Sequence, residues 1–234
     1  MSAWLDRLSA EVRQRRVVSL DRPFVVALAG GVASGKSTIA KALASRLRKD
    51  GLTVEVVGTD GFLFPNAELD RRGLMDRKGF PESHDAGRLT GFLEQLTSGA
   101  SPLRVPTYSH ETYDVGAERS FARPDVVLIE GLIALQAGVE PVDLGLFLDV
   151  DEDDLITWYI ERFMDLERWD APRLADRLAE VGGDPEALAG DIWDRINGPN
   201  LNDHILPTRS RADLVLHKDE RHAIRLLAPA SKPA

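Results

Sequence analysis

Apolar positions along the chain follow two alternating patterns. Short, nearly continuous apolar runs, typical of strands buried on both faces of a parallel sheet, occupy 24–29, 53–58, 125–131, 144–150 and 212–217. Apolar residues three or four positions apart, typical of amphipathic helices, occupy 4–12, 36–51, 86–96, 155–166 and 172–196. Because strands and helices alternate, we predict an α/β fold of three layers with a doubly wound, mainly parallel sheet.

One segment, 62–84, departs from both patterns because it has little periodicity and many charges. We interpret it as a substrate loop or flap. The chain of 234 residues suffices for one domain and is short for two. We therefore predict a single domain over 1–234, with a short N-terminal helix in 1–20 and a flexible tail at 228–234.

Composition narrows the chemistry and the partners. The formal net charge of −9 disfavours non-specific nucleic-acid binding, although a pocket can still be locally positive. The absence of cysteine excludes disulfides, thiolate metal sites and a cysteine nucleophile. The first residues lack the apolar core of a signal peptide, and no apolar run is long enough to span a membrane. We expect a cytoplasmic protein that acts without nucleic acid or membrane.

The turn after the first strand, "GGVASGKST", carries a glycine-rich motif. Gly30, four residues, then Gly35, Lys36 and Ser37 fit the P-loop pattern, in which backbone amides surround phosphates, the lysine reaches the outer phosphates and the hydroxyl binds Mg²⁺. A chance glycine-rich turn is the alternative, but a strand precedes this one and an amphipathic helix follows. We predict a nucleoside triphosphate site made by Gly30, Gly31, Val32, Ala33, Ser34, Gly35, Lys36, Ser37 and Thr38.

Two acids follow predicted strands and should lie at the carboxyl edge of the sheet, where ligands bind in open α/β folds. Glu130 ends "DVVLIEG" and is suited to hold Mg²⁺, the alternative being a solvated strand end. Asp60, in "VVGTDGFLFP", is suited to accept the proton of a substrate hydroxyl, although an aspartate before glycine more often belongs to a turn. We expect Phe62 and Phe64 to shield this carboxylate from water.

The chain also resembles a known family through six motifs: "TDGFLFPN", "RGLMDRKGFPESHD", "PTYSHETYDV", "IEGLIALQ", "TWYIERF" and "ILPTRSRADLVL". They are similar to those of type I bacterial pantothenate kinases, which belong to the phosphoribulokinase and uridine kinase group of P-loop enzymes. The resemblance runs from about Phe24 to His222. It implies ATP-dependent phosphorylation of pantothenate to 4′-phosphopantothenate, the first step of coenzyme A synthesis, by a homodimer.

The resemblance implies roles for individual residues. Asp60 takes the position of the catalytic base, and Lys36 that of the phosphate-binding lysine. Arg162 takes the position of the arginine that stabilises the transferred phosphoryl group, where negative charge spreads over three oxygens. A helix-surface arginine paired with a neighbouring acid is the alternative for Arg162. Lys218 and His222, otherwise a solvated charge run, match positions beside the adenine base.

The resemblance also places substrate residues. The positions that line the pantothenate pocket are matched by Tyr108, His110, Tyr113 and Tyr159. Without the resemblance, the tyrosines would be packing residues and His110 a hydrogen-bonded structural histidine. Asn200 is retained in "NLNDHILPTR", but His204 stands where the family has an asparagine that contacts pantothenate.

Two further positions depart from the family pattern. Ile133 replaces an asparagine, and Leu166 replaces an aromatic residue near the pantetheine side of the pocket. Changes of polar partner in a pocket can shift specificity by orders of magnitude. We therefore expect a family-like phosphoryl-transfer site with an altered acceptor pocket. Five acids in 149–154 resemble a metal cluster, but they lie at a strand-to-helix junction, where we predict helix capping.

Other functions remain in view. A paralogous kinase could phosphorylate another alcohol, such as a nucleoside, a sugar or a pantothenate-like amide. An ATP-binding switch protein belongs to a different class. Such a protein needs no base for a substrate alcohol, so the predicted base Asp60 argues against this alternative. A nucleic-acid-dependent ATPase is disfavoured by the acidic composition.

Overall fold

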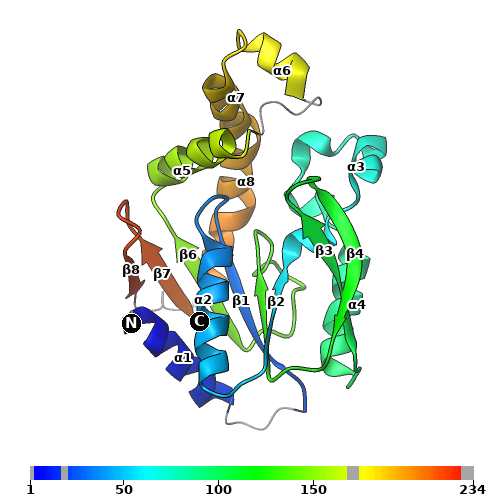
Figure 1. The fold of residues 1–234 in the computed structure, drawn as a ribbon, viewed down its shortest axis with the longest axis vertical. Helices are drawn as coiled ribbons and strands as arrows, with labels where there is room; N and C mark the ends of the chain where they lie inside the picture. The colour runs from blue at the N-terminus through cyan, green and yellow to red at the C-terminus, as the bar shows by residue number, and fades with distance from the viewer. Residues whose placement is uncertain (1–2, 17–20, 168–173, 228–234) are drawn as a thin grey trace.

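The structure is a computed structural model that describes residues 3–16, 21–167 and 174–227. Its centre is a six-stranded sheet with the strand order β2-β5-β1-β6-β7-β8. The first five strands in that order run parallel and β8 is antiparallel to β7 (Figure 1). The strands are β1 (Phe24–Gly30), β2 (Val54–Gly58), β5 (Val126–Glu130), β6 (Leu144–Asp149), β7 (Leu214–Lys218) and β8 (Ile224–Leu227).

Helices cover both faces of this sheet. Alternate side chains of β1 point to opposite faces: Val25, Ala27 and Ala29 join one buried cluster, and Phe24, Val26 and Leu28 join the other. The first cluster includes residues of α4 (Ala86–Thr97), α5 (Glu152–Asp165) and α7 (Pro185–Ile192). The second includes residues of α1 (Ala3–Arg16) and α2 (Lys36–Lys49). The predicted three-layer, mainly parallel α/β fold is confirmed.

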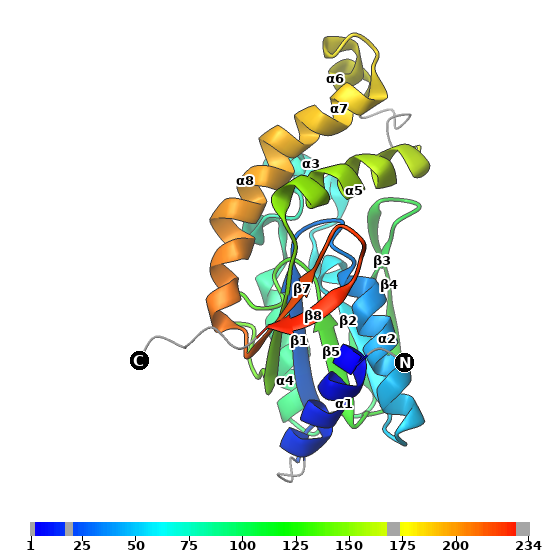
Figure 2. The ribbon, with the colours of Figure 1, turned by 90° about the vertical axis from the view of Figure 1, so that its left-hand side faces the viewer.

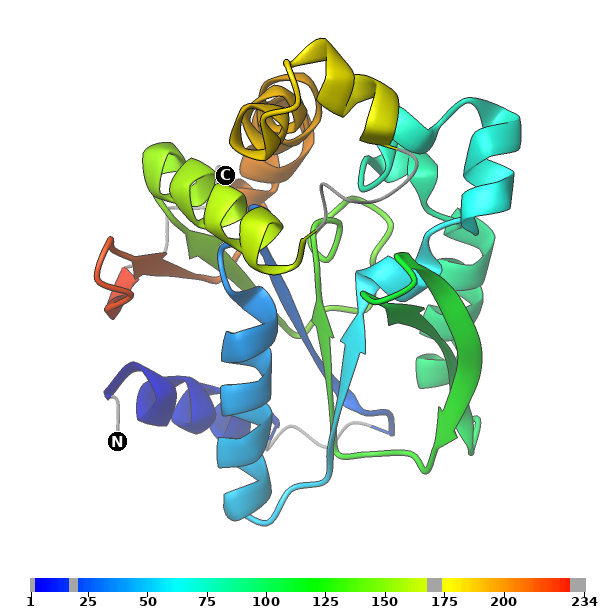
Figure 3. The ribbon, with the colours of Figure 1, turned by 45° about the horizontal axis from the view of Figure 1, so that its top comes forward.

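A second, two-stranded sheet was not predicted. It is the antiparallel hairpin of β3 (Leu103–Ser109) and β4 (Asp114–Phe121), which stands beside β2 and α4 (Figure 3). Most residues of β4 are exposed or half-buried, so the strand lacks the apolar run that identifies the central strands. The short edge strand β8 alternates half-buried and exposed positions and was missed for the same reason.

The charged segment 62–84 has a defined local structure. It contains α3 (Asn66–Arg72) and two 3₁₀ turns, η2 (Met75–Arg77) and η3 (Pro81–Ser83). The backbone amide of Phe64 donates to Ser83 at 2.9 Å, and that of Asp85 donates to Phe62 at 2.7 Å. These bonds close the segment into a folded loop beside the end of β2.

The predicted helix over 172–196 is divided. Residues 172–173 lie outside the described residues, and α6 (Ala175–Glu180) is separated from α7 by Gly182 and Gly183, whose φ angles of 75° and 80° end a helix. After α7 the chain continues through η6 (Trp193–Asn197), α8 (Gly198–Asn200), η7 (Leu201–Ile205) and η8 (Leu206–Arg211). Both η6 and η7 are π-helical turns and flank Pro199, which has no N–H to donate. Figure 2 shows this long segment rising beyond the sheet together with α5.

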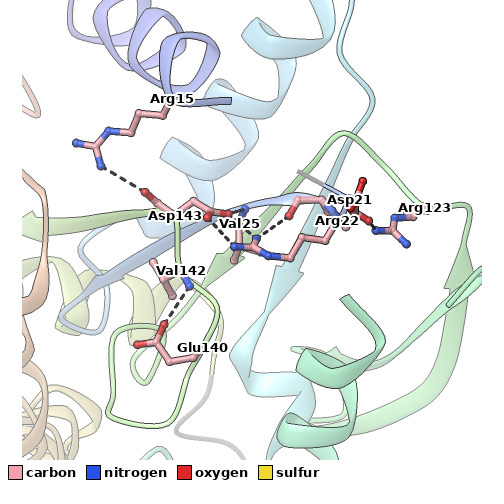
Figure 4. A network of polar contacts seen from close by, with 9 residues as sticks. Arg15, Asp21, Arg22, Val25, Arg123, Glu140, Val142 and Asp143 are labelled. Atoms are coloured by element: carbon pink, nitrogen blue, oxygen red, sulfur yellow. Dashed lines mark hydrogen bonds and ion pairs between the residues drawn. The ribbon is translucent and has the colours of Figure 1, made fainter. Parts of the chain in front are cut away.

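The amino-terminal edge of the sheet is held by ion pairs. Asp143, just before β6, accepts hydrogen bonds from Arg22 at 2.7 and 2.8 Å and from the Val25 amide at 2.8 Å (Figure 4). Arg15 of α1 donates to the carbonyl of Asp143 at 3.3 Å, and Arg123 donates to the carbonyl of Asp21. These contacts join α1, β1 and β6 on the side of the sheet opposite the P-loop.

The acidic run 149–154 only partly matches its predicted role. Asp151 is the residue before α5, but its carboxylate accepts no capping hydrogen bond. Glu152, Asp153 and Asp154 occupy the first turn, where carboxylates complement the helix dipole. Within the described ranges, no group of three or more acids or histidines could hold a metal ion, and no helix is long and apolar enough to cross a membrane.

Candidate active site

The P-loop joins β1 to the amino end of α2. Gly30 and Gly35 have φ angles of 154° and 98°, and a Cβ atom on Gly30 would lie 2.6 Å from the carbonyl oxygen of Leu148. Only glycine fits at Gly30, because any side chain would collide with the neighbouring strand. The Nζ atom of Lys36 donates to the carbonyl of Gly31 at 2.6 Å. This backbone places amides and the positive end of the α2 dipole around a site suited to phosphates.

Ser37 and Glu130 meet beside the P-loop. Ser37, in the first turn of α2, donates its hydroxyl hydrogen bond to the Glu130 carboxylate at 2.8 Å. Glu130 is the last residue of β5, a direct neighbour of β1 in the sheet. A hydroxyl oxygen and a carboxylate oxygen at the phosphate site fit the preference of Mg²⁺ for oxygen ligands and substrate phosphates.

Burial opposes charge at both ends of this cluster. Burial raises the pKa of the Glu130 carboxyl, although Lys36 and the Ser37 hydrogen bond act in the opposite direction. Burial also lowers the pKa of the Lys36 ammonium, against the attraction of Glu130 and Asp60. The site is therefore a low-dielectric environment in which an added anion or cation interacts strongly.

Asp60 lies in the 3₁₀ turn η1 (Thr59–Phe62), directly after β2. With Lys36, Ser37 and Glu130 it lines a cavity of about 290 Å³, here called the central cavity. The predicted shielding of Asp60 by two phenylalanines is wrong. Phe62 is fully buried in the core, 5.7 Å from the Phe92 ring centroid, and the Arg72 guanidinium covers Phe64 at 3.8 Å from its ring centroid. Neither ring lines the cavity.

A second cavity of about 120 Å³, here called the inner cavity, adjoins the first. Four of the predicted substrate residues line it, from the hairpin and from α5: Tyr108, His110, Tyr113 and Tyr159. Asp60 and Arg162 line both the central and the inner cavity. One carboxylate and one guanidinium therefore stand where the two spaces join.

Two polar side chains of the inner cavity were not predicted from the sequence. Lys78 of the 62–84 segment donates to the Asn66 side chain at 2.6 Å and to the Tyr113 carbonyl at 2.5 Å, and lies 3.9 Å from the Tyr113 ring centroid. Asn197 ends the π-helical turn η6, and its Nδ2 atom is buried without a hydrogen-bond partner. The nearby Gly198-Pro199 pair signals an irregular helix, but only tertiary structure shows that Asn197 lines the cavity.

Three positions singled out from the family pattern lie outside these cavities. Asn200 donates to the Gly79 carbonyl at 3.0 Å, and so ties the long C-terminal helical segment to the 62–84 segment. The His204 ring makes an edge contact with Phe80 at 5.5 Å between centroids. Ile133 is buried in the core. None of the three is among the residues that line the central or inner cavity.

An open outer cavity of about 480 Å³ lies on the other side of Arg162. Lys218 and His222 line it, together with the exposed Leu166 and with Trp158, which sequence reasoning missed. The Lys218 ammonium lies 3.9 Å from the Trp158 ring centroid and donates to the Ser34 carbonyl of the P-loop at 2.9 Å. The His222 ring packs against the Trp158 ring, with 4.4 Å between the two centroids. An aromatic and cationic wall next to the P-loop suits a nucleotide base.

The chain is similar in sequence to known kinases. Residues 25–224 match the model of the phosphoribulokinase / uridine kinase family. A pantothenate kinase of Sorangium cellulosum is 47% identical over 220 residues, which cover 87% of this chain and 71% of that protein. A pantothenate kinase of Rhodococcus jostii is 43% identical over 218 residues, covering 88% and 70%.

Solved structures share the fold. A putative fructose transport system kinase from Silicibacter sp. is 27% identical, with a TM-score of 0.69 over 86% of this chain and 93% of that one. A D-glycerate 3-kinase from Cryptococcus neoformans is only 14% identical, yet it has a TM-score of 0.70 over 97% and 100% of the two chains. This second likeness concerns the fold alone.

Proposed function

The chain belongs to the phosphoribulokinase and uridine kinase family, and we propose that within this family it transfers the terminal phosphoryl group of ATP to pantothenate. The observation that carries the proposal is the junction of the central and inner cavities, where Asp60 and Arg162 line both spaces. Pantothenate kinases that are 47% and 43% identical over most of this chain support the choice of acceptor.

The chemistry follows from the side chains. Pantothenate carries a primary alcohol and a carboxylate. In the reaction the alcohol oxygen forms a bond to the terminal phosphorus of ATP while the bond from that phosphorus to the bridging oxygen breaks. We propose that Asp60 accepts the alcohol proton and that Lys36 and Arg162 stabilise the charge on the transferred group. Lys78, which lines the inner cavity as Asn197 does, complements the acceptor carboxylate.

We propose Ser37 and Glu130 as the residues that hold Mg²⁺ with the phosphates. Their oxygen atoms lie 2.8 Å apart at the P-loop, and both are ligand types that Mg²⁺ accepts. When bound, the ion neutralises phosphate charge. The resemblance to pantothenate kinases further supports a cytoplasmic homodimer that acts in coenzyme A synthesis. Light scattering of the purified protein tests the dimer directly, and a monomer mass would contradict it.

A panel of acceptors in a coupled assay for ADP release tests the proposed function. The panel contains pantothenate, a pantothenate-like amide, nucleosides and sugars, with ATP and Mg²⁺ held constant. We expect pantothenate to give the highest kcat/KM. Turnover of a nucleoside or a sugar without turnover of pantothenate would identify a paralogous kinase, and ATP hydrolysis that no acceptor stimulates would favour a switch protein.

The variant Asp60→Asn tests the assignment of the base. It keeps the shape of the side chain but removes the proton acceptor, so we expect kcat to fall by at least about 10²-fold while ATP binding is unchanged. The neighbouring exposed acid Asp70, on α3 and outside the cavities, provides the control Asp70→Asn, which should retain wild-type turnover. Near-normal turnover of Asp60→Asn would remove Asp60 from this role.

A further inference from the structure

The β3–β4 hairpin brings acceptor-binding side chains to the active site without belonging to the central sheet. It forms its own two-stranded sheet, and β2 is one of the two edge strands of the six-stranded sheet. Tyr108 lies in β3, and His110 and Tyr113 lie in the turn that follows. Where the hairpin sits relative to β2 therefore decides how far these side chains are from Asp60.

One side chain of the hairpin contacts the edge strand through two polar groups. Arg119 of β4 donates to the Glu55 carboxylate at 2.8 Å and to the backbone carbonyl of Val56 at 2.7 Å. Glu55 and Val56 are consecutive residues of β2. The planar guanidinium fixes both distance and orientation, because its donors are held in one rigid fork.

This contact is close to the reacting groups. Arg119 lies opposite Val105 in the register of the hairpin. The β3 residues from Val105 to Tyr108 line the central cavity. Arg119 itself lines that cavity together with Asp60 and Glu130. Arg119 is therefore paired across the hairpin with the β3 residue from which the chain runs, through a register shift between Pro106 and Tyr108, to the acceptor pocket.

The hairpin packs tightly against the turn that carries Asp60. A Cβ atom on Gly61 would lie 2.6 Å from the carbonyl oxygen of Pro106 in β3. The backbone of β3 thus rests directly on the residue after Asp60. A hairpin that moved away from β2 would change the separation between the acceptor side chains and the carboxylate at the same time.

We propose that Arg119 is a positioning residue for the acceptor: it clamps the hairpin to the free edge of β2 and so sets the distance between Tyr108, His110 and Asp60. This inference rests on the proposed phosphoryl transfer and assigns it a specificity element outside the P-loop. Glu55 serves the clamp by holding the guanidinium on β2.

The variant Arg119→Met tests the clamp, because it keeps the apolar stem and removes every donor. We expect KM for the acceptor to rise about tenfold, the effect of losing charge-assisted hydrogen bonds, while KM for ATP stays within about twofold. Arg119→Lys should recover part of the loss, since an ammonium keeps the charge and its donors but lacks the rigid planar fork that holds both acceptors at fixed positions. Glu55→Gln should give a smaller rise in the same KM.

The matched control is Arg88→Met. Arg88 of α4 pairs with Glu118 of the same hairpin strand at 3.3 Å, but it does not line the cavity. It should leave both KM values unchanged. An acceptor KM within about twofold of wild type in Arg119→Met, or an equal rise in both KM values, would overturn the proposal. If Arg119→Met does not fold, Glu55→Gln decides by the same two criteria.

The measurement uses the best acceptor that the wild-type protein phosphorylates. Failure of wild type to use pantothenate counts against the proposed function and transfers the comparison to another alcohol. If wild type phosphorylates the acceptor well but Arg119→Met changes the acceptor KM and the ATP KM equally, the result counts against the Arg119 clamp alone.

Discussion

The two edges of the central sheet treat their polar groups in opposite ways. At the amino edge, Asp143 accepts hydrogen bonds from Arg22 and from the Val25 amide, and Asp125 accepts hydrogen bonds from the hydroxyl and the amide of Thr53. Each carboxylate there is matched to protein donors. These aspartates stabilise the fold, because they also bind arginines of α1 and so hold that helix at the starts of the strands.

The carboxyl edge leaves polar atoms without protein partners. In the parts of the chain that the structure describes, five buried side-chain atoms have no hydrogen-bond partner: Ser34 Oγ, Thr59 Oγ1, His84 Nε2, Asn197 Nδ2 and Asn200 Oδ1. Asn197 lines the inner cavity, and the other four lie in segments that contribute other residues to the walls of the two cavities. Since buried polar groups are normally satisfied, the unpaired Asn197 nitrogen in the wall of the inner cavity is the one of the five that is placed to meet a ligand there. The difference teaches that one sheet can be stabilised at one edge and prepared for ligands at the other.

The largest expected effect comes from Glu130→Gln at the carboxyl edge. We expect kcat to fall about 10²-fold, because an amide replaces the carboxylate proposed to hold Mg²⁺. The free energy of unfolding should not fall at neutral pH. Burial raises the pKa of Glu130, so the folded protein binds this proton more tightly than the unfolded chain does.

The sign of the pH dependence follows from that shift. Between the ordinary carboxyl pKa and the raised value, the free energy of unfolding decreases as pH rises, and the substitution removes this contribution. Urea unfolding of wild type and variant at neutral and mildly acidic pH measures the effect. A variant that is clearly less stable than wild type at neutral pH would mean that Glu130 is a structural residue like those of the opposite edge.

Asp143→Ala at the amino edge should give the reverse result. It leaves the Arg22 guanidinium and the Val25 amide without their acceptor, so we expect a loss of about 2–3 kcal/mol in the free energy of unfolding. The kcat should stay within about twofold, because the cavities lie at the other edge. Asp21→Ala is the matched control, since Arg123 contacts only its backbone carbonyl. A large fall in kcat with little loss of stability would break the comparison.

Asn197→Ala returns to the carboxyl edge with a smaller effect. We expect KM for the acceptor to rise about tenfold, because the variant loses a side chain that lines the inner cavity and whose Nδ2 atom has no protein partner. Stability should be unchanged or slightly higher. Asn202→Ala, at an exposed position of the same helical segment, is the control. An unchanged acceptor KM would show that the Asn197 amide has no part in substrate binding.

The sequence predicts the parts of the fold and of the site that depend on local patterns, but not the parts that depend on tertiary contacts. Strands with continuous apolar runs, the P-loop and the positions of Asp60 and Glu130 at strand ends follow from periodicity and chain order. The β3–β4 hairpin does not, because its exposed strand β4 lacks an apolar run. Lys78 and Asn197 reach the inner cavity through a folded loop and a π-helical turn, whose placement depends on tertiary contacts. Phe62 shows the opposite error: an apolar residue beside a catalytic candidate packs into the core against Phe92.

The smallest and most direct test compares two threonines that flank the same strand, β2. At the amino edge, the Thr53 hydroxyl donates to Asp125 at 2.7 Å and accepts from its amide at 2.8 Å. At the carboxyl edge, Thr59 is 1% exposed and its hydroxyl has no partner. Thr53→Val should therefore cost about 1 kcal/mol in the free energy of unfolding.

Thr59→Val replaces a buried, unpaired hydroxyl by a methyl group of the same shape. We expect the free energy of unfolding to stay the same or rise by up to about 1 kcal/mol, because no hydrogen bond is lost and a desolvation penalty is removed. Chemical denaturation of the two single variants and of the double variant measures both effects and their additivity. Equal destabilisation by the two substitutions would show that the Thr59 hydroxyl is satisfied in the protein without ligand. The contrast between the two edges of the sheet would then not extend to β2. The buried polar atoms without a partner would be confined to the P-loop, the 62–84 segment and the C-terminal helical segment.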